Sequence, residues 1–189
     1  MTSVAVSNAV LWALMLGVIV ALWVLARRVG RLHERVAAMG SQTVDPGPRA
    51  GERAPHFELQ SLTGADVTTG GERTRTQLIF FLSPTCPLCK KLLPVLRACA
   101  QAERDHVDVV LAGEGDPARH LGFLRDANLA QFPCALSAAL VQAYRVNRLP
   151  HAVLIDRQGV IRATGPIDDR SQLESLFRAL AIDSAPMPG

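Results

Sequence analysis

Residues 76–94 read TQLIFFLSPTCPLCKKLLP, and this stretch decides the fold class. It begins with a largely apolar run of strand length, which predicts a central strand covered on both faces. A turn follows, and a helix is predicted from the C-x-x-C motif onward. Cys86 therefore falls where a buried strand passes into a helix. Unpaired backbone N–H groups and the helix dipole stabilise a thiolate at such a position.

The C-x-x-C motif has two interpretations, because the same spacing forms half of many zinc sites. A zinc site needs two more ligands at similar closeness, whereas Cys99 and Cys134 each stand alone with no paired histidine. Both are predicted to be small buried residues without a redox role. We therefore expect a redox pair with no metal and no cofactor. In that pair Cys86 is the exposed nucleophile, and Cys89, one helical turn inward, resolves the mixed disulfide.

Three prolines fit the predicted active site. Pro87 lies inside the motif, and Pro94 stands where it would kink the helix that the motif opens. Pro150 precedes an apolar strand over 151–156, and a cis Leu149–Pro150 bond would bring the backbone beside the cysteine pair. We expect Pro87, Leu149 and Pro150 to support the active site and to dock the substrate.

The rest of the chain from residue 51 alternates between strand and helix patterns. Further strands are expected near 56–59, 107–112 and 132–136, helices over 117–128, 137–144 and 171–181, and a hairpin over 151–165. This order predicts a three-layer α/β sheet with helices on both faces, occupying residues 51–183 before a tail at 184–189.

The N-terminal part predicts a membrane anchor. After a short tail at 1–8, residues 9–26 carry no charge and are almost wholly apolar. As a helix this run would span about 27 Å, close to the hydrocarbon thickness of a bilayer. A cleaved signal peptide is the competing interpretation, but the basic n-region of such a peptide is missing. Residues 27–50 are expected to form a juxtamembrane helix and a linker.

The charge distribution argues against a nucleic-acid-binding domain and bears on the orientation of the predicted span. The formal net charge is +3, and residues 50–189 contribute nothing to it because 15 basic side chains balance 15 acidic ones. A nucleic-acid-binding domain would carry a basic excess, so no nucleic-acid partner is expected. The excess lies at the arginines after the predicted span, and the positive-inside rule would place the domain that follows in the cytoplasm.

The order of strand, C-x-x-C motif, Pro94-containing helix and Leu149-Pro150 resembles the thioredoxin superfamily over residues 51–183. With the N-terminal span and the LHER segment at 32–35, the chain is similar over nearly its whole length to the MauD family of methylamine utilization. This resemblance implies a membrane-anchored thiol–disulfide oxidoreductase that assists disulfide formation or isomerisation in the methylamine dehydrogenase small (β) subunit. It further implies a membrane electron-transfer partner, and a single-pass inner-membrane protein whose thioredoxin-like domain faces the periplasm.

Departures from thioredoxin leave alternatives open. Phe80 stands where thioredoxin has a buried acidic residue, and Thr85 replaces the tryptophan before the first cysteine. General protein reduction is therefore not the expected activity. One alternative is a cytochrome c maturation-type thiol reductase with the same anchor and fold. Another is a binding module: a copper carrier using both motif cysteines and His151, or a redox-inert chaperone of the small subunit.

Overall fold

The computed structural model describes residues 12, 15–17, 20, 47–64 and 66–183, with only the backbone over 179–183. The chain divides into two compact units, Met1–Asp45 and Pro46–Gly189. The predicted juxtamembrane helix and most of the predicted span lie outside the described residues. At the described positions of the first unit the backbone is helical, and Trp12, Met15, Leu16 and Val20 are exposed. Within the described part of the chain, no helix has the length and apolarity that a membrane crossing requires.

A five-stranded mixed sheet organises the second unit, with the strands in the order β5-β4-β3-β6-β7. The strands are β3 (Thr76–Phe81), β4 (Val107–Gly113), β5 (Cys134–Leu136), β6 (His151–Ile155) and β7 (Ile161–Pro166). β3 runs parallel to β4 and antiparallel to β6. The predicted central strand is therefore confirmed, and its apolar sequence matches burial on both sides.

The side chains of β3 and its extension alternate between two cores. Leu78, Phe80 and Leu82 join the larger core on one face of the sheet, whereas Ile79 and Phe81 join the smaller core on the other face. All five are at most 1% exposed. Successive side chains of a strand point to opposite faces, so one continuous apolar run fills both cores.

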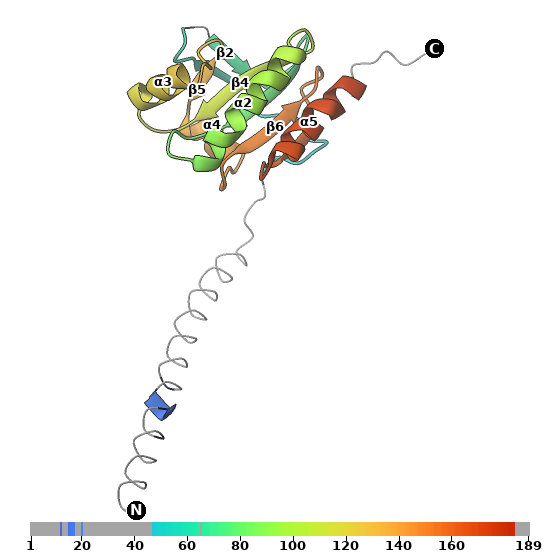
Figure 1. The fold of residues 1–189 in the computed structure, drawn as a ribbon. Coiled ribbons are helices and arrows are strands. Elements are labelled where there is room, and N and C mark those ends of the chain that lie inside the picture. The colour runs from blue at the N-terminus through green and yellow to red at the C-terminus, as the bar shows by residue number, and fades with distance from the viewer. Residues whose placement is uncertain (1–11, 13–14, 18–19, 21–46, 65, 184–189) are drawn as a thin grey trace, which may run out of the picture. The chain divides into compact units, whose positions relative to one another are not determined.

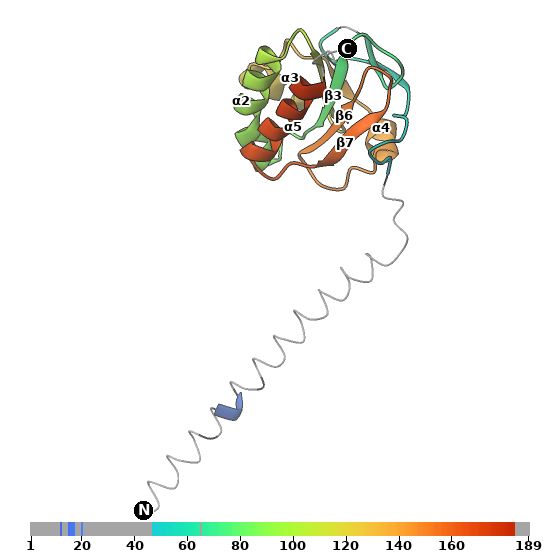
Figure 2. The same ribbon diagram turned by 90° about the vertical axis from the view of Figure 1, so that its right-hand side faces the viewer.

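Helices cover both faces of the sheet. α2 (Pro87–Ala102), α3 (Pro117–Asp126) and α5 (Arg170–Asp183) pack on one face, and α4 (Ala138–Ala143) packs on the other. Figure 1 shows α2 between α3 and α5, and Figure 2 shows α4 on the opposite side of the strands. The predicted thioredoxin-like three-layer arrangement is therefore confirmed.

Carboxylate or hydroxyl caps begin α3, α4 and α5, where the sequence changes from loop to helix pattern. Asp116 accepts from the backbone N–H groups of Ala118 and Arg119 at the start of α3, and the Ser137 hydroxyl accepts from Leu140 N at the start of α4. Asp169 accepts from Gln172 N at 2.8 Å and caps α5. These caps satisfy donors that the first turn of a helix leaves unpaired.

Two antiparallel hairpins are also present, and the second is the one predicted over 151–165. β1 (Phe57–Gln60) pairs antiparallel with β2 (Asp66–Thr69) in a separate two-stranded sheet, and β6 pairs antiparallel with β7. The β6–β7 turn requires glycine at position 159, where φ is +78°. A Cβ at that position would also lie 2.8 Å from the Gly71 carbonyl oxygen. Both constraints exclude larger residues.

Candidate active site

Cys86 caps the N-terminus of α2. Its backbone is extended, with φ −81° and ψ 113°, and its Sγ accepts a hydrogen bond from Cys89 N at 3.2 Å. Pro87 is the first helical residue, where the missing N–H costs nothing because that donor has no helical partner. The structure therefore places the motif at the strand-to-helix junction, as predicted.

The two motif thiols differ in exposure. Cys86 is half-buried, whereas Cys89 is 0% exposed within the larger core. Burial, followed by the hydrogen bond with Cys86, raises the pKa of Cys89 to about 12. The prediction that Cys86 is the more exposed thiol is confirmed. Cys89 is held as a neutral thiol at physiological pH, and a reagent from solution reaches Cys86 first.

The Leu149–Pro150 peptide lies beside the first cysteine. The bond is cis, and the Cys86 thiol donates to the Leu149 carbonyl with a sulfur–oxygen distance of 3.8 Å. Pro150 is buried, and its carbonyl accepts from Ile167 N at 2.9 Å, which links this loop to the end of β7. Both parts of the prediction for this loop, the cis bond and its closeness to Cys86, are confirmed.

Ser83 organises the loop between β3 and α2, a role that the sequence analysis missed. Its carbonyl accepts from Cys86 N at 3.1 Å, and its hydroxyl oxygen lies 2.9 Å from Thr85 Oγ1 and accepts from Thr85 N. Serine side chains commonly bond the backbone two residues on, so the Ser-Pro-Thr sequence carried a signal for this turn. The turn fixes the direction from which Cys86 enters the helix.

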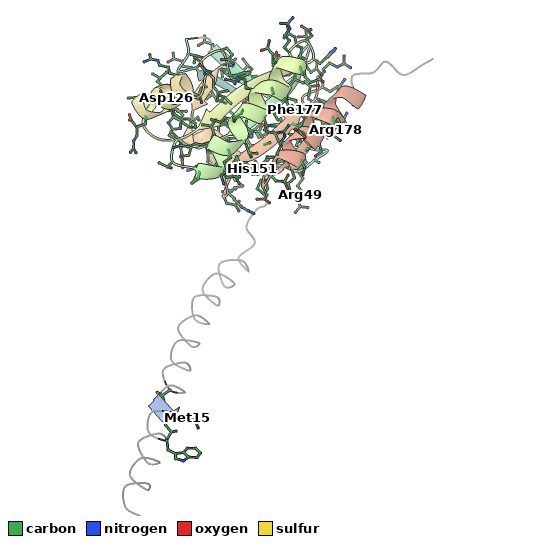
Figure 3. All side chains as sticks on the ribbon, in the orientation of Figure 1. Met15, Arg49, Asp126, His151, Phe177 and Arg178 are labelled. Carbon is green, nitrogen blue, oxygen red and sulfur yellow. The ribbon has the colours of Figure 1, made fainter. Side chains whose placement is uncertain are left out.

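His151 lies at the start of β6 but faces away from the cysteines. Its imidazole packs edge-on against Phe81, with ring centroids 6.1 Å apart, and Phe81 belongs to the core under α4. Nε2 lies 3.1 Å from the Thr164 hydroxyl, and burial lowers the pKa of the imidazole. Figure 3 labels His151. In the part of the chain that the structure describes, no three His, Cys, Asp or Glu side chains form a possible metal site. The copper site with His151 therefore does not assemble.

The other two cysteines differ from each other. Cys134 is fully buried in β5, as predicted, and burial raises its pKa to about 11. Cys99 lies on α2 and is only half-buried at the edge of the larger core, so the prediction of a buried residue is wrong for it. Position 99 falls on the side of α2 that packs near Arg170 and Glu174 of α5, where the cover is incomplete.

The arrangement supports exchange between a thiol pair and an external disulfide. One sulfur is accessible and accepts a backbone N–H, the second sulfur is buried one turn away, and a backbone carbonyl flanks the accessible sulfur. A thiolate at Cys86 keeps the N–H bond and stops donating to Leu149 O. Ionisation thus leaves that carbonyl able to accept from an incoming N–H.

Comparison with known proteins agrees with this chemistry. Residues 49–180 match the redoxin family. The chain is 42% identical over 179 residues to the methylamine utilization protein MauD of Paracoccus versutus, which covers 95% of this chain and 90% of that protein. It is 41% identical over 175 residues to MauD of Methylorubrum extorquens, covering 92% and 84% of the two chains.

Among solved structures, a putative thiol:disulfide interchange protein DsbE from Chlorobium tepidum matches with a TM-score of 0.63. The match covers 72% of this chain and 98% of that one, at 21% identity. At this identity the likeness concerns the fold alone. The same three-layer arrangement therefore occurs with widely different sequences.

Proposed function

The chain belongs to the redoxin family and to its MauD proteins, and we propose that Cys86 and Cys89 are its catalytic pair. It is a thioredoxin-like thiol–disulfide oxidoreductase of methylamine utilization. The observation that carries the proposed roles is the unequal placement of two neighbouring sulfurs. Cys86 Sγ sits half-buried at the start of α2 and accepts from Cys89 N, while Cys89 is fully buried.

In the first step the Cys86 thiolate attacks one sulfur of a client disulfide. A Cys86–client mixed disulfide forms, the client disulfide breaks, and the second client sulfur leaves as a thiolate. The helix N-terminus stabilises the attacking thiolate, and Pro87 sets the residue at which the helix begins. The Leu149 carbonyl, held in place by buried Pro150, accepts a backbone N–H from the client.

In the second step Cys89 transfers its proton to the client thiolate and attacks Cys86 Sγ. The mixed disulfide breaks, a Cys86–Cys89 disulfide forms, and two electrons have passed to the client. The reverse sequence oxidises a client dithiol. Burial raises the pKa of Cys89, so this thiol needs a proton acceptor beside it, which the client thiolate provides.

The proposed client is the methylamine dehydrogenase small (β) subunit, whose disulfides the enzyme would form or isomerise during maturation. A membrane electron-transfer partner would reset the redox state of the cysteine pair. The support is the similarity to MauD proteins over 95% of the chain, together with the thiol geometry.

The proposed location is the inner membrane, with residues 9–26 as a single-pass anchor, residues 27–50 as juxtamembrane helix and linker, and residues 51–183 in the periplasm. Disulfides form and persist outside the cytosol, so a catalyst of their formation shares that compartment. The arginines after the span favour the opposite orientation. An alkaline phosphatase fused after residue 50 should be active, and an inactive fusion with an active cytoplasmic reporter would refute this topology.

Client trapping with Cys89→Ala tests the function. Without a resolving thiol, the mixed disulfide at Cys86 should accumulate in cells that assemble methylamine dehydrogenase, and mass spectrometry should identify the small subunit. Cys99→Ala is the matched control, because it removes a half-exposed thiol of the same helix outside the motif. Cys86→Ala/Cys89→Ala should trap nothing. Capture of other proteins without the small subunit would refute this client, and no capture at all would refute the catalytic roles.

A further inference from the structure

A groove runs along α2 beside the active site, between this helix and the C-terminal part of α3. It has a volume of about 440 Å³. One wall carries Lys90, Leu93, Pro94 and Arg97 of α2, and the other carries Phe123 and Asp126 with the turn that follows α3. Figure 1 shows the two helices on the same face of the sheet, and Figure 3 labels Asp126 on α3.

We propose that this groove binds an apolar segment with acidic residues on the client protein, next to the client's reactive cysteine. The inference rests on the redox function proposed above and adds the means of client recognition.

Charge favours an acidic occupant. α2 contains Lys90, Lys91 and Arg97 and no acidic residue, while α3 contains Arg119, Arg125 and Asp126. All six side chains are exposed. The two helices thus carry five basic groups against one carboxylate, although residues 50–189 as a whole are neutral. Of these six side chains, Lys90, Arg97 and Asp126 line the groove itself, so its walls carry two basic groups against one carboxylate. A client carboxylate would be attracted there, and a client lysine would be repelled.

The groove also has an apolar interior. Leu93 is 3% exposed and belongs to the larger core, and Phe123 packs half-buried against that core. Pro94 is exposed in the wall. An extended segment can therefore bury an apolar side chain against Pro94 and Phe123.

The position relative to Cys86 suits a client segment. Lys90 follows Cys89 directly, so the groove begins at the first turn of the catalytic helix. Arg97 lies eleven residues after Cys86, which is about 16 Å along a helix axis. An extended peptide covers that distance in about five residues. A client whose cysteine reacts with Cys86 can thus place the residues four or five positions away beside Arg97.

Two synthetic peptides test this inference on the full chain in a neutral detergent. Each peptide carries one cysteine disulfide-bonded to a coloured aromatic thiol, with leucine and two charged residues four to six positions away. One peptide has glutamates and the other lysines. Attack by the Cys86 thiolate on the peptide sulfur forms the Cys86–peptide disulfide and expels the coloured thiolate. Stopped-flow absorbance then gives the second-order rate constant at low salt. The symmetric aromatic disulfide, too small to reach the groove, measures the intrinsic reactivity of Cys86.

The wild type should react faster with the acidic peptide than with the basic one by roughly two- to fivefold for each ion pair. Arg97→Glu should reverse this preference when each peptide rate is divided by the rate of the same protein with the small disulfide. Lys91→Glu is the matched control, since Lys91 is exposed on the same helix but does not line the groove, and it should keep most of the preference.

Three results would overturn the groove assignment: equal rates for both peptides, equal effects of Arg97→Glu and Lys91→Glu, or a change in oligomeric state with Arg97→Glu. The last result would identify a second copy of this chain as the occupant. Failure of the wild type to react with the small disulfide would instead refute the redox function itself.

Discussion

At the two ends of the antiparallel pair β3–β6, the polar side chains differ in how strongly they are hydrogen-bonded to the protein. At one end Asp156 follows β6; it is 4% exposed and its carboxylate accepts from Gln158 N, Val160 N and Arg162 Nε. At the other end, beside the start of β6, the half-buried Cys86 sulfur has a 3.2 Å contact with Cys89 N and a 3.8 Å contact with Leu149 O.

Because of this difference, the Asp156 end contributes to the stability of the fold and the Cys86 end to thiol reactivity. Three short hydrogen bonds, at 2.6–2.9 Å, satisfy the Asp156 carboxylate and close the β6–β7 turn. The contacts of Cys86 involve sulfur, which is a weak donor and acceptor, so a client can replace them at small cost. A cavity of about 220 Å³ at the Asp156 end is lined by Asp156 and Arg162, which already pair with each other. We therefore expect changes at the Asp156 end to affect folding, and changes at the Cys86 end to affect exchange.

The largest expected effect is on catalysis. Cys86→Ser should lower the rate of exchange with a small aromatic disulfide by more than about a thousandfold, because a hydroxyl does not replace a thiolate nucleophile. The measurement is the rate of coloured-thiol release. The midpoint of thermal unfolding should change little, since serine keeps a polar group at the helix cap. A variant that retained exchange through Cys89 would contradict the division of roles.

The Asp156 end should show the reverse pattern. Asp156→Asn should lower the free energy of unfolding by about 2 kcal/mol, because charge-assisted hydrogen bonds are lost in a buried turn. Denaturant titration gives this value. Asp105→Asn is the control, since Asp105 is exposed and has only a 3.9 Å contact with Arg104. Small-disulfide exchange by the folded Asp156 variant should match the wild type, and a large loss of exchange would break the comparison.

Alkaline pH should destabilise the reduced protein through its buried thiols. The pKa of Cys89 rises from 9.0 to about 12 on folding, so the unfolded chain loses this proton first. Stability from this group is complete below about pH 9 and falls as the pH rises toward 12, by up to about 1.4 kcal/mol per pH unit. Urea titrations at several pH values should show this loss.

The variant Cys89→Ala isolates the contribution of Cys89 to the pH dependence of stability. It should reduce the slope of stability against pH without abolishing it, because burial also raises the pKa of Cys134 to about 11 and raises the pKa of Tyr144. Cys134→Ala should remove a second part of the slope. Stability that increased between pH 9 and pH 11 in the reduced wild type would show that Cys89 is not buried as a neutral thiol.

The smallest effect is expected at the exposed ion pair between Arg148 and Asp168, near the Leu149–Pro150 bond. The two side chains are 62% and 43% exposed. Solvent screens such pairs, so Asp168→Asn should change the free energy of unfolding by less than about 1 kcal/mol. Denaturant titration beside Asp156→Asn provides the measurement. An effect as large as that of Asp156→Asn would show that ion pairing also stabilises the catalytic end.

Most of the fold followed from patterns within short windows of sequence. The apolar run at 76–82, the turn that begins at Pro84 and the helix after Cys86 all occur where they were expected. Helix-starting residues such as Asp116 and Ser137 act on backbone groups two or three positions away, so their effect is readable locally. The strand near residue 134 is shorter than expected, because its pairing with β4 covers only three positions.

The active site was predictable in its cysteines and less so in its surroundings. The C-x-x-C spacing at a strand-to-helix junction singled out Cys86 and Cys89. The position of Ser83 as the hydrogen-bonding centre of the loop was missed, as was the groove beside α3. A groove depends on how two helices pack across the sheet, and neither helix pattern alone contains that information. The absence of acidic residues from α2 was visible in the sequence. The sequence did not show that α3 lies beside α2 and forms a groove with it.

The sequence by itself determined the sheet, the catalytic helix and the order of the two motif thiols, because these depend on apolar periodicity and on contacts within one helical turn. Only the tertiary structure decided what surrounds Cys86. The Leu149 carbonyl reaches its sulfur across 63 positions of sequence, and the antiparallel register of β3 with β6 turns His151 to the opposite face. The half-burial of Cys99 likewise depends on how closely α5 covers α2. Such placements follow from the packing of whole elements, and local sequence does not encode them.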